Sequence, residues 1–470
     1  MPLNVSHEVA YQPPAYALHA LEILESAGYE AWIVGGWVRD ALLGAACHDV
    51  DITTSALWNQ SARLFAEAGC AVHETGIKHG TITVVVEGHP IEVTTYRVEG
   101  VYSDHRHPDS VRYVRKVTDD LARRDFTINA MAYHPQRGLL DPYGGAEDLA
   151  QGLVRAVGRP ADRFYEDALR VLRAVRFACR MGFRMEESTH AALVAAAPGL
   201  DNIAQERIGQ ELCGILRTGR VGWALLHEPE VMCAALPELE PMYGFDQLSI
   251  WHVYDVLEHT VHVCNAIEAF TAGVASLRLR WAALLHDVGK PACCVIDDMG
   301  RGHFYGHPIE GAEMSERILR RFGLPGELVR STCTLIRYHD HVVRPTARSM
   351  RRTLAILGEA NHGNALVLAH ELMDLKRADA VSKQPKCAAY AIELDAMDRI
   401  LDEEKHKGAP LRVSDLAVGG KEVLELLGGK PGPMVGMILS TLLQAVVDNE
   451  VENTREALMG ELWRMLQEQE

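Results

Sequence analysis

Short apolar runs near the start of the chain give way to longer stretches with helical periodicity. Residues 32–34 are apolar and predict a buried strand, and Gly35-Gly36 predicts a tight turn into a helix that Gly44 can end. A second strand is expected around residues 49–53. Residues 166–181 contain neither Gly nor Pro, and apolar side chains at 169, 172, 175 and 177 predict one helix from 166 onward, packed on one side.

Two carboxylates, Asp49 and Asp51, lie on the expected second strand, where residues i and i+2 point the same way. Two carboxylates on one face repel unless cations join them, so the pair predicts a site for two Mg²⁺ ions. Such ions activate an attacking hydroxyl and neutralise a leaving pyrophosphate. The turn at Gly35 and Gly36 lets backbone N–H groups approach phosphate oxygens. These features indicate nucleotidyl transfer, and the alternative is a surface turn with two solvated aspartates.

Three further motifs follow in order. They are Arg123-Arg124-Asp125-Phe126-Thr127-Ile128-Asn129-Ala130, Asp141-Pro142-Tyr143-Gly144-Gly145 and Glu166-Asp167-Ala168-Leu169-Arg170-Val171-Leu172-Arg173. Over roughly residues 15–215 the chain closely resembles the class II CCA-adding tRNA nucleotidyltransferase family of the DNA polymerase β-like superfamily. The resemblance implies template-independent addition of C, C and then A to the 3′ acceptor end of tRNA. CTP and ATP would be the donors, in a two-metal reaction that releases pyrophosphate.

The third motif suits recognition of the incoming base. Asp167 and Arg170 stand at i and i+3 of the expected helix, so they would project together. A carboxylate only accepts hydrogen bonds and a guanidinium only donates them. Cytosine and adenine offer an amino donor beside a ring-nitrogen acceptor, whereas uracil and guanine place a carbonyl there. The pair would therefore reject U and G by about 1–3 kcal/mol. The alternative is a surface ion pair.

The resemblance also assigns roles around the nucleotide. Arg124 would contact the triphosphate and Asp125 the ribose, and Asn129, one helical turn beyond, would support Asp125. Arg173 would be a further phosphate contact, since a guanidinium can bond phosphate bidentately. Gly35 would belong to the same nucleotide-binding set, together with Gly36.

Two other residues have two interpretations each. Arg39 could face phosphate, or it could pair with Asp40 or Asp49. Glu92 lies on an expected strand and could be a third metal-site carboxylate, although a solvated strand face is favoured. The polar segment 98–108 resembles the flexible loop that CCA-adding and A-adding relatives use to switch from C to A. CC-adding relatives lack this loop, so its presence favours A addition.

A second group of candidate ligands begins near residue 250. Imidazole and carboxylate groups suit a divalent transition metal, and adjacent His and Asp residues can bind it from one helix. The group resembles the HD phosphohydrolase superfamily, in which metals activate water against phosphate esters. The ligands implied are His259, His286, Asp287 and Asp379, with His307 and His339 extending the set to a second metal. The alternative is a helical domain without turnover, and nearby His262, His303 and His341 could be confused with the ligands.

Taken together, the resemblances imply an α+β fold, with a small mixed β-sheet nucleotidyltransferase head followed by all-α neck, HD and tail regions. The expected domains are a catalytic head at 15–160, a helical neck for nucleotide and RNA binding at 161–240, an HD domain at 250–400 and a helical tail at 410–470. Pro160 separates head from neck. A Gly-Pro turn at 428–433 could meet tRNA backbone or merely connect two helices of the tail.

Composition agrees with a large enzyme of 470 residues and two to four domains. No apolar run is long enough to span a membrane, no signal peptide is recognised, and ten scattered cysteines without a CxxC motif fit a cytoplasmic protein. The net charge of −17 is unusual for an RNA enzyme, but residues 155–184 carry +5 and residues 106–124 carry +3. A local basic groove on an acidic body is therefore expected.

Other functions remain open from the sequence. A poly(A) polymerase of the bacterial type shares the head, but the basic-aromatic stretch usual after its aspartates is missing from residues 55–65. An enzyme that adds only the terminal A is a second alternative. An HD phosphohydrolase with a nucleotide- or RNA-binding head is a third, of another class, and the intact head motifs argue against it. The oligomeric state is left open.

Overall fold

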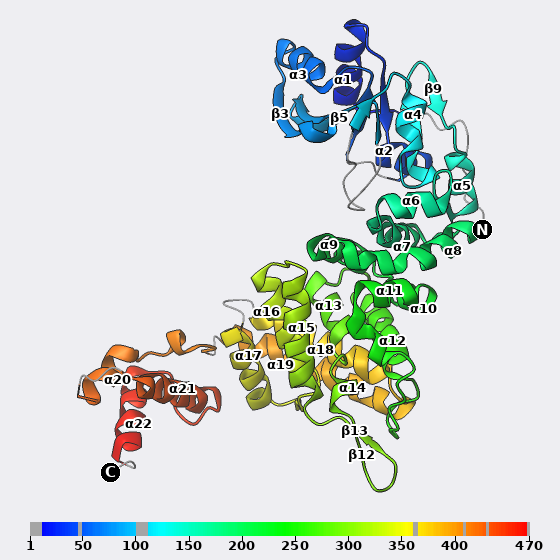
Figure 1. Cartoon of the computed structure of the whole chain (residues 1–470). Coiled ribbons are helices and arrows are strands. Elements are labelled where there is room, and N and C mark those ends of the chain that lie inside the picture. The colour runs from blue at the N-terminus through cyan, green and yellow to red at the C-terminus, as the bar shows by residue number, and fades with distance from the viewer. Residues whose placement is uncertain are drawn as a thin grey trace. The chain divides into compact units, whose positions relative to one another are not determined.

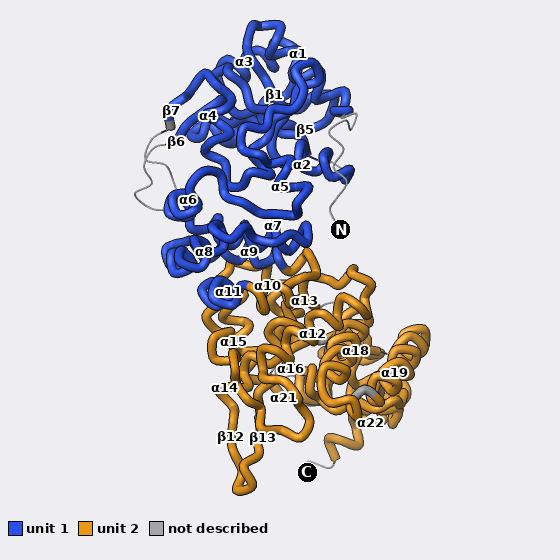
Figure 2. Tube along the Cα trace, turned by 90° about the vertical axis from the view of Figure 1, so that its right-hand side faces the viewer, with its two compact units in different colours: residues 1–215, 228–235 blue, residues 216–227, 236–470 orange. Residues whose placement is uncertain are grey.

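The computed structural model describes residues 12–45, 49–99, 111–360, 365–407, 410–428 and 432–467. The chain forms two compact units, residues 1–215 with 228–235 and residues 216–227 with 236–470 (Figure 2). Among the described residues, no helix has both the length and the apolar character needed to cross a membrane.

A mixed β-sheet organises the first unit and is coloured blue to cyan in Figure 1. Its strand order in the described residues is β3-β4-β5-β2-β1-β8-β9. β2 and β5 run parallel, and the other neighbouring strands are antiparallel. The strands are β1 (Ala31–Val34), β2 (Asp51–Thr54), β3 (Ala71–Gly76), β4 (Thr81–Val86), β5 (His89–Thr95), β8 (Ala132–His134) and β9 (Gly138–Leu140).

The two faces of this sheet differ in chemistry. Buried apolar residues such as Ile33, Ile52 and Ile82 share one face, and α1 (Ala15–Ser26) and α3 (Trp58–Glu67) pack against the strands. Residues that alternate with them along β2, β4 and β5 point the other way. That opposite side, the polar sheet face, carries Asp51, Thr81, Thr83, Glu92 and Thr94.

The predicted strand–glycine–helix unit is confirmed. β1 ends at Val34, Gly35 adopts a φ of 72°, and α2 (Gly36–Leu42) begins at the next residue. Gly44 follows with a φ of 65°. The second strand begins later than predicted, because its first partner in β1 is Val34, opposite Asp51. Asp49 therefore precedes the strand, and its predicted position on it is wrong.

Smaller elements complete the head. β6 (Arg97–Glu99) pairs with β7 (Val111–Tyr113), and α4 (Val117–Ala122), η1 (Ile77–His79), η2 (Thr127–Asn129) and α5 (Gly145–Gln151) connect the strands. The predicted switch loop at 98–108 lies mostly outside the described residues, which resume at residue 111.

The neck is helical, but not as one helix from 166. α6 (Pro160–Glu166) ends before Asp167, which is extended, and α7 (Leu169–Met181) begins two residues later. The Asp167 side chain accepts a hydrogen bond from the Leu169 N–H at 3.0 Å, and this capping interaction competes with continuation of the helix. The neighbours are β10 (Leu153–Val154), β11 (Arg184–Met185), α8 (Glu187–Ala196), η3 (Ala197–Asn202), α9 (Gln205–Arg217) and α11 (Pro229–Ala235).

The second unit is helical apart from one short hairpin, among the residues described. Its first part contains α10 (Val221–His227), η4 (Pro237–Met242), α12 (Val256–Phe270), α13 (Leu277–Leu285), α14 (Lys290–Cys293), β12 (Val295–Ile296), β13 (Gly302–His303), α15 (His307–Arg321), α16 (Gly326–Tyr338), α17 (Ala347–Ala360), α18 (Ala365–Val381), η5 (Pro385–Ala388) and α19 (Ala389–His406). The tail contains η6 (Val413–Asp415), α20 (Gly420–Leu426), α21 (Pro433–Val447) and α22 (Arg455–Gln467), which enclose an apolar cluster of their own. Residues 429–431 of the Gly-Pro turn are outside the described residues. The predicted α+β fold class is confirmed.

Two adjacent glycines at the start of α5 make a matched test of packing. A Cβ on Gly145 would lie 2.3 Å from the carbonyl oxygen of Thr127, whereas Gly144 has a φ of 71° and open space around it. We expect Gly145→Ala to lower the free energy of unfolding by about 1–3 kcal/mol, because backbone must move. Gly144→Ala should cost about 1 kcal/mol from backbone strain alone. Urea unfolding compares them, and an equal loss in both variants would contradict the clash.

Candidate functional site

One cavity of about 720 Å³ in the first unit gathers most of the predicted nucleotide-site residues. It lies between the polar sheet face and the start of α7. Its walls include Gly35, Gly36, Arg39, Asp51, Arg124, Asp125, Asn129, Asp167, Arg170 and Arg173. Asp49 is exposed and is not among these lining residues.

Two carboxylates meet at the sheet end of this cavity, and a third, Asp49, is close enough to act on Asp51 electrostatically. Parallel pairing of β2 with β5 places Asp51 opposite Glu92, and both residues line the cavity. Burial, then the charges of Glu92 and Asp49, raise the pKa of Asp51 to about 6, against the opposing effect of Arg124. Together with burial, this cluster of acids keeps the pKa of Asp51 raised despite the charge of Arg124. Its donor set, oxygen atoms only, is the one that a hard divalent cation prefers.

Gly35 forms the floor on the side of β1. A Cβ at this position would lie 3.0 Å from Nη1 of Arg124 and 3.8 Å from Oδ2 of Asp51. The same Arg124 atom donates a hydrogen bond to the carbonyl oxygen of Asn129 at 3.3 Å. The glycine therefore brings backbone, arginine and carboxylate within a few ångströms, as an approach of phosphate toward Asp51 requires.

A buried network joins α2 to α7 through Asp125. Arg39 donates to Asn129 Oδ1 at 2.7 Å, and Asn129 Nδ2 donates to Asp125 Oδ1 at 3.2 Å. Arg173 donates to Asp125 Oδ2 from Nε at 2.9 Å and from Nη2 at 2.6 Å. Burial alone would raise the pKa of Asp125, but Arg173 overcomes it and brings the pKa to about 2. Arg39 also pairs with Asp40 at 2.7 Å, as one of its two interpretations predicted.

Asp167 and Arg170 both line the cavity, but they are not paired side chain to side chain as the surface-pair alternative required. Arg170 donates to Glu166 Oε2 at 2.7 Å and to the carbonyl oxygens of Arg163 and Arg123, each at 3.2 Å. Asp167 accepts a hydrogen bond from Nη2 of Arg207 at 3.0 Å. Each group thus has its own support, which holds an acceptor and a donor separately at the cavity wall.

Sequence reasoning missed several residues of this wall. Arg176, Phe177, Arg180 and Arg207 also line the cavity. The guanidinium of Arg176 lies 4.9 Å from the centre of the Phe177 ring. Arg176 and Phe177 follow Arg173 at i+3 and i+4, so helical spacing could have found them. Arg207 comes from a different helix, α9, and no local pattern indicates it.

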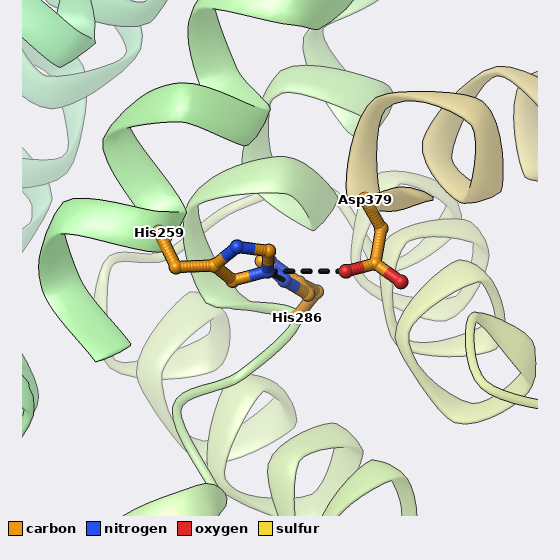
Figure 3. Close-up of side chains that lie close together, drawn as sticks. All are labelled: His259, His286 and Asp379. Atoms are coloured by element: carbon orange, nitrogen blue, oxygen red, sulfur yellow. Dashed lines mark hydrogen bonds and ion pairs between the residues drawn. The ribbon is translucent and has the colours of Figure 1, made fainter. Parts of the chain in front are cut away.

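A second site lies within the helices of the second unit. His259, His286 and Asp379 form one buried trio, and Asp287, His307 and His339 form another. Figure 3 shows the first trio, with Nε2 of His259 3.1 Å from Oδ1 of Asp379 and 3.4 Å from Nε2 of His286. In the second trio, the Nε2 atoms of His307 and His339 are 3.4 Å apart.

Asp287, a member of the second trio, also contacts the first. Its Oδ2 lies 3.1 Å from Nε2 of His286, and its Oδ1 lies 3.5 Å from Nε2 of His307. The predicted HD ligands therefore come together in the structure. His262, His303 and His341, which could have been confused with them, are in neither trio: His262 stacks on Tyr254, and His303 bonds Asp297.

The orientation of the four imidazoles fits a metal centre. Each Nδ1 faces a backbone carbonyl oxygen: His259 that of Ser382 at 3.3 Å, His286 that of Ala283 at 2.9 Å, His307 that of Phe304 at 2.8 Å and His339 that of Ile336 at 2.7 Å. A carbonyl only accepts, so Nδ1 carries the proton and donates it. The lone pair of each Nε2 is then directed at the shared centre, as in histidine ligands held by a backbone partner.

Two lysines, missed in the sequence, neutralise the carboxylates of this site. Lys290 Nζ lies 2.7 Å from Asp287 Oδ2, and Lys383 Nζ lies 2.6 Å from Asp379 Oδ2. Both lysines line a cavity of about 690 Å³ together with Asp287, His307, His339 and Asp379. Lys383 follows Asp379 by one helical turn, so its position was predictable from spacing.

Family models match several segments of the chain. A poly(A) polymerase head domain model matches residues 31–155, and an HD domain model matches residues 251–384. A model described as an RNA- and SrmB-binding site of polymerase A matches residues 182–243. A tRNA nucleotidyltransferase domain 2 model matches residues 366–462.

Similar proteins extend over nearly the whole chain. The CCA-adding enzyme of Geobacillus thermodenitrificans (strain NG80-2) is 33% identical over 463 residues, which are 98% of this chain and 99% of that protein. The CCA-adding enzyme of Geobacillus kaustophilus (strain HTA426) is 33% identical over 461 residues, 97% of each. This chain belongs to the family of CCA-adding enzymes.

The fold of the CCA-adding enzymes is found here as well. The crystal structure of the Bacillus stearothermophilus CCA-adding enzyme in complex with CTP superposes with a TM-score of 0.74 at 30% identity, covering 98% of this chain and 99% of that one. A Thermotoga maritima CCA-adding enzyme complexed with tRNA, 20% identical, shares the fold with a TM-score of 0.56 over 98% of each chain. The predicted tRNA nucleotidyltransferase is confirmed, and the poly(A) polymerase, A-only and phosphohydrolase alternatives are not favoured.

Members of the CCA-adding family are metal-dependent nucleotidyltransferases, so the head requires a divalent cation. The carboxylates around Asp51 are the candidate ligands for this cation. The division into four domains and the roles of individual residues stay predictions, although every predicted residue except Asp49 lies in one of the two cavities or in the buried trios.

Proposed function

We propose that this CCA-adding enzyme adds C, C and then A to the 3′ acceptor end of tRNA, with CTP and ATP as donors and pyrophosphate as product. The observation that carries the proposal is a single cavity in which Asp51, the Gly35 turn and the Asp167–Arg170 wall all meet. Metal-site, phosphate-binding and base-reading groups within one cavity are the minimum for a template-independent nucleotidyl transfer. The enzyme acts in the cytoplasm, where tRNA and both nucleotides are available.

Asp49 and Asp51 are the ligands of two Mg²⁺ ions, and Glu92 is a third carboxylate at that centre. When bound, the ions lower the pKa of the RNA 3′-hydroxyl and offset charge on the triphosphate. The raised pKa of Asp51, caused first by burial and then by the charge of Glu92, supports this assignment, because a bound cation would stabilise the charged carboxylate. Asp49 reaches the same metal centre from the short segment that precedes β2.

The remaining side chains orient the nucleotide. Arg124 and the backbone of Gly35 and Gly36 receive the triphosphate, and Arg39 and Arg173 add positive charge nearby. Asp125 keeps a charged carboxylate toward the ribose, held by Asn129 and Arg173. The α-phosphate is thereby fixed beside Asp51 for in-line attack by the RNA 3′-hydroxyl, with pyrophosphate leaving on the side of the glycine turn.

Base choice rests on Asp167 and Arg170. Asp167 accepts the exocyclic amino hydrogen of C or A, and Arg170 donates to the adjacent ring nitrogen. Arg207 holds Asp167 and Glu166 holds Arg170, which limits the freedom of these two groups to adapt to U or G. Preorganised partners make a mismatch costly, since a wrong base leaves buried polar groups unpaired.

Replacing Asp51 by Asn tests the metal centre. We expect the rate of nucleotide addition to fall at least ~10³-fold, about 4 kcal/mol at the transition state. Burial and Glu92 raise the pKa of Asp51 from 3.8 to about 6, so its ionisation destabilises the metal-free fold progressively between these pH values and fully above them. Metal-free Asp51→Asn protein at pH 7 should therefore melt no lower than wild type.

Magnesium supplies a readout that does not depend on activity. Mg²⁺ should raise the melting temperature of wild type and of a Glu67→Gln control, whose carboxylate lies on α3 behind the sheet, but not that of Asp51→Asn. An equal Mg²⁺ effect on Asp51→Asn and wild type, or near-normal addition by the variant, would refute the assignment of Asp51.

Base selection is tested by Asp167→Ala and Arg170→Ala. Incorporation of UTP or GTP relative to CTP and ATP should rise by about 5- to 150-fold, equivalent to about 1–3 kcal/mol. Asp162→Ala, on the preceding helix, removes the same charge from an ion pair with Arg159 at 3.7 Å and should leave selection unchanged. The measurement is kcat/KM for each nucleotide on tRNAs ending before C74, C75 and A76. A uniform loss for all four nucleotides would mean that the pair does not read the base.

A second activity is supported at the other site. We propose that the two buried trios bind divalent transition metals and hydrolyse phosphate esters. The supporting observation is the orientation of four imidazoles with Nε2 toward Asp287, each held through Nδ1 by a backbone carbonyl. When bound, the metals supply an activated water. Lys290 and Lys383 offset the charge of the two aspartates and face the cavity.

The double variant His286→Ala/Asp287→Ala separates the two sites. It should lose bound transition metal and any metal-dependent phosphatase or phosphodiesterase activity, while addition of C and A persists within roughly tenfold, about 1.4 kcal/mol. His262→Ala is the control, because this imidazole belongs to neither trio. Metal analysis after dialysis and assays on 2′,3′-cyclic nucleotides give the result. Unchanged metal content in a folded double variant would refute the ligand set.

A further inference from the structure

The polar sheet face continues beyond the carboxylates, away from the glycine turn. In the sheet order, β1 with Gly35 flanks the β2 residue Asp51 on one side, and β5 and then β4 flank it on the other. Thr94 of β5 pairs in register with Thr81 of β4. Their hydroxyl oxygens are 2.9 Å apart, and both residues are only half-buried. Hydroxyl groups therefore line the cavity wall beside Asp51, on the side away from the Gly35 turn.

A small group of polar residues stands at this end of the cavity. We call it the acceptor platform, and it consists of His79, Thr81, Thr94 and Arg97, all of which line the same cavity as Asp51. Arg97 of β6 donates from Nη1 to the carbonyl oxygen of His79. The ring of Tyr113 covers Gly80, where an added Cβ would come within 2.8 Å of Tyr113 Cε1. The platform is thus a packed part of the head.

The direction of attack determines what this wall can receive. Under the proposed function, on which this inference rests, the triphosphate lies at the Gly35 turn and the base at Asp167. In-line displacement requires the attacking hydroxyl and the leaving pyrophosphate to stand on opposite sides of the α-phosphate. The side of Asp51 opposite the glycine turn is the side of β5 and β4. We propose that the acceptor platform binds the 3′-terminal nucleotide of the RNA that is being extended.

The chemistry of the platform fits a ribose-phosphate unit. Arg97 can donate to a phosphate oxygen through its guanidinium, the strongest arrangement for that anion. The hydroxyls of Thr81 and Thr94 can both donate and accept, as the 2′-hydroxyl of RNA does. Such contacts read backbone and sugar but not the base. One platform can therefore serve three successive primer ends that differ in sequence.

Removing the charge of Arg97 is the principal test. The probe is a fluorescent acceptor-stem minihelix RNA that ends before A76, titrated at several KCl concentrations. Arg97→Gln should raise the Kd for this RNA at least about fivefold and reduce the slope of log Kd against log salt by about 0.7, the value for one phosphate contact in a single strand. The KM for ATP should stay within twofold, because the nucleotide lies on the other side of Asp51.

Matched variants exclude a general effect of charge or folding. Arg63→Gln removes an equally basic, exposed side chain from α3 and should change neither Kd nor slope. Arg97→Lys keeps the charge and should restore the salt slope. Thr81→Val keeps the shape without the hydroxyl and should raise Kd about two- to tenfold, the effect of one hydrogen bond. It also provides the test if Arg97→Gln does not fold.

The outcomes separate this inference from the proposed function. Wild-type protein that does not extend the minihelix with ATP would overturn the proposed function itself. Wild type that extends it, together with unchanged Kd and slope in a folded Arg97→Gln protein, would overturn only the acceptor platform. A rise in the KM for ATP equal to the rise in Kd would also overturn it, because Arg97 would then serve the nucleotide.

Discussion

Parallel pairing of β2 with β5 is the interaction on which the head depends. It sets Asp51 directly opposite Glu92, although the two residues are far apart in the sequence. The cost is electrostatic, since burial and then the neighbouring charge of Glu92 raise the pKa of Asp51 to about 6. The apolar face of the same strands, with Ile52 and Val93 buried beneath helices, holds the pairing in place. Core packing thus maintains an arrangement that the acids alone would oppose.

Arginine side chains pair with the other carboxylates of this cavity. Asp125 accepts two hydrogen bonds from Arg173 and one from Asn129, and so connects the sheet end of the cavity to α7. Asp167 and Arg170 are likewise held by separate partners, Arg207 and Glu166, rather than by each other. A buried donor or acceptor that is held in one geometry discriminates between ligands, because it cannot turn to pair with a wrong one. Under the proposed function, the ion pairs of this wall therefore act on specificity more than on stability.

The sequence predicted what is local. The turn at Gly35 follows from conformational freedom that only glycine has, and the HD ligands follow from residue type and motif. It failed where a short-range hydrogen bond competed with periodicity: the Asp167 side chain ends one helix and begins the next. The favoured solvent exposure of Glu92 agrees with the structure, in which this side chain is exposed, but its position opposite Asp51 appears only when β5 is placed beside β2. Arg207 was missed because α9 carries it to Asp167 from a separate element, whereas Lys383 was missed despite helical spacing.

The two sites differ in the ions that their donor sets favour. Around Asp51 the potential ligands are carboxylate oxygens, which suit a hard, strongly hydrated ion such as Mg²⁺. Around Asp287 four imidazole nitrogens join two carboxylates, and nitrogen-rich sets bind later first-row divalent ions far more tightly than they bind magnesium. Under the proposed function, the head therefore works with an ion that the helical site binds poorly. Each group of candidate ligands lies within one compact unit, so neither proposed reaction needs a metal ligand from the other unit.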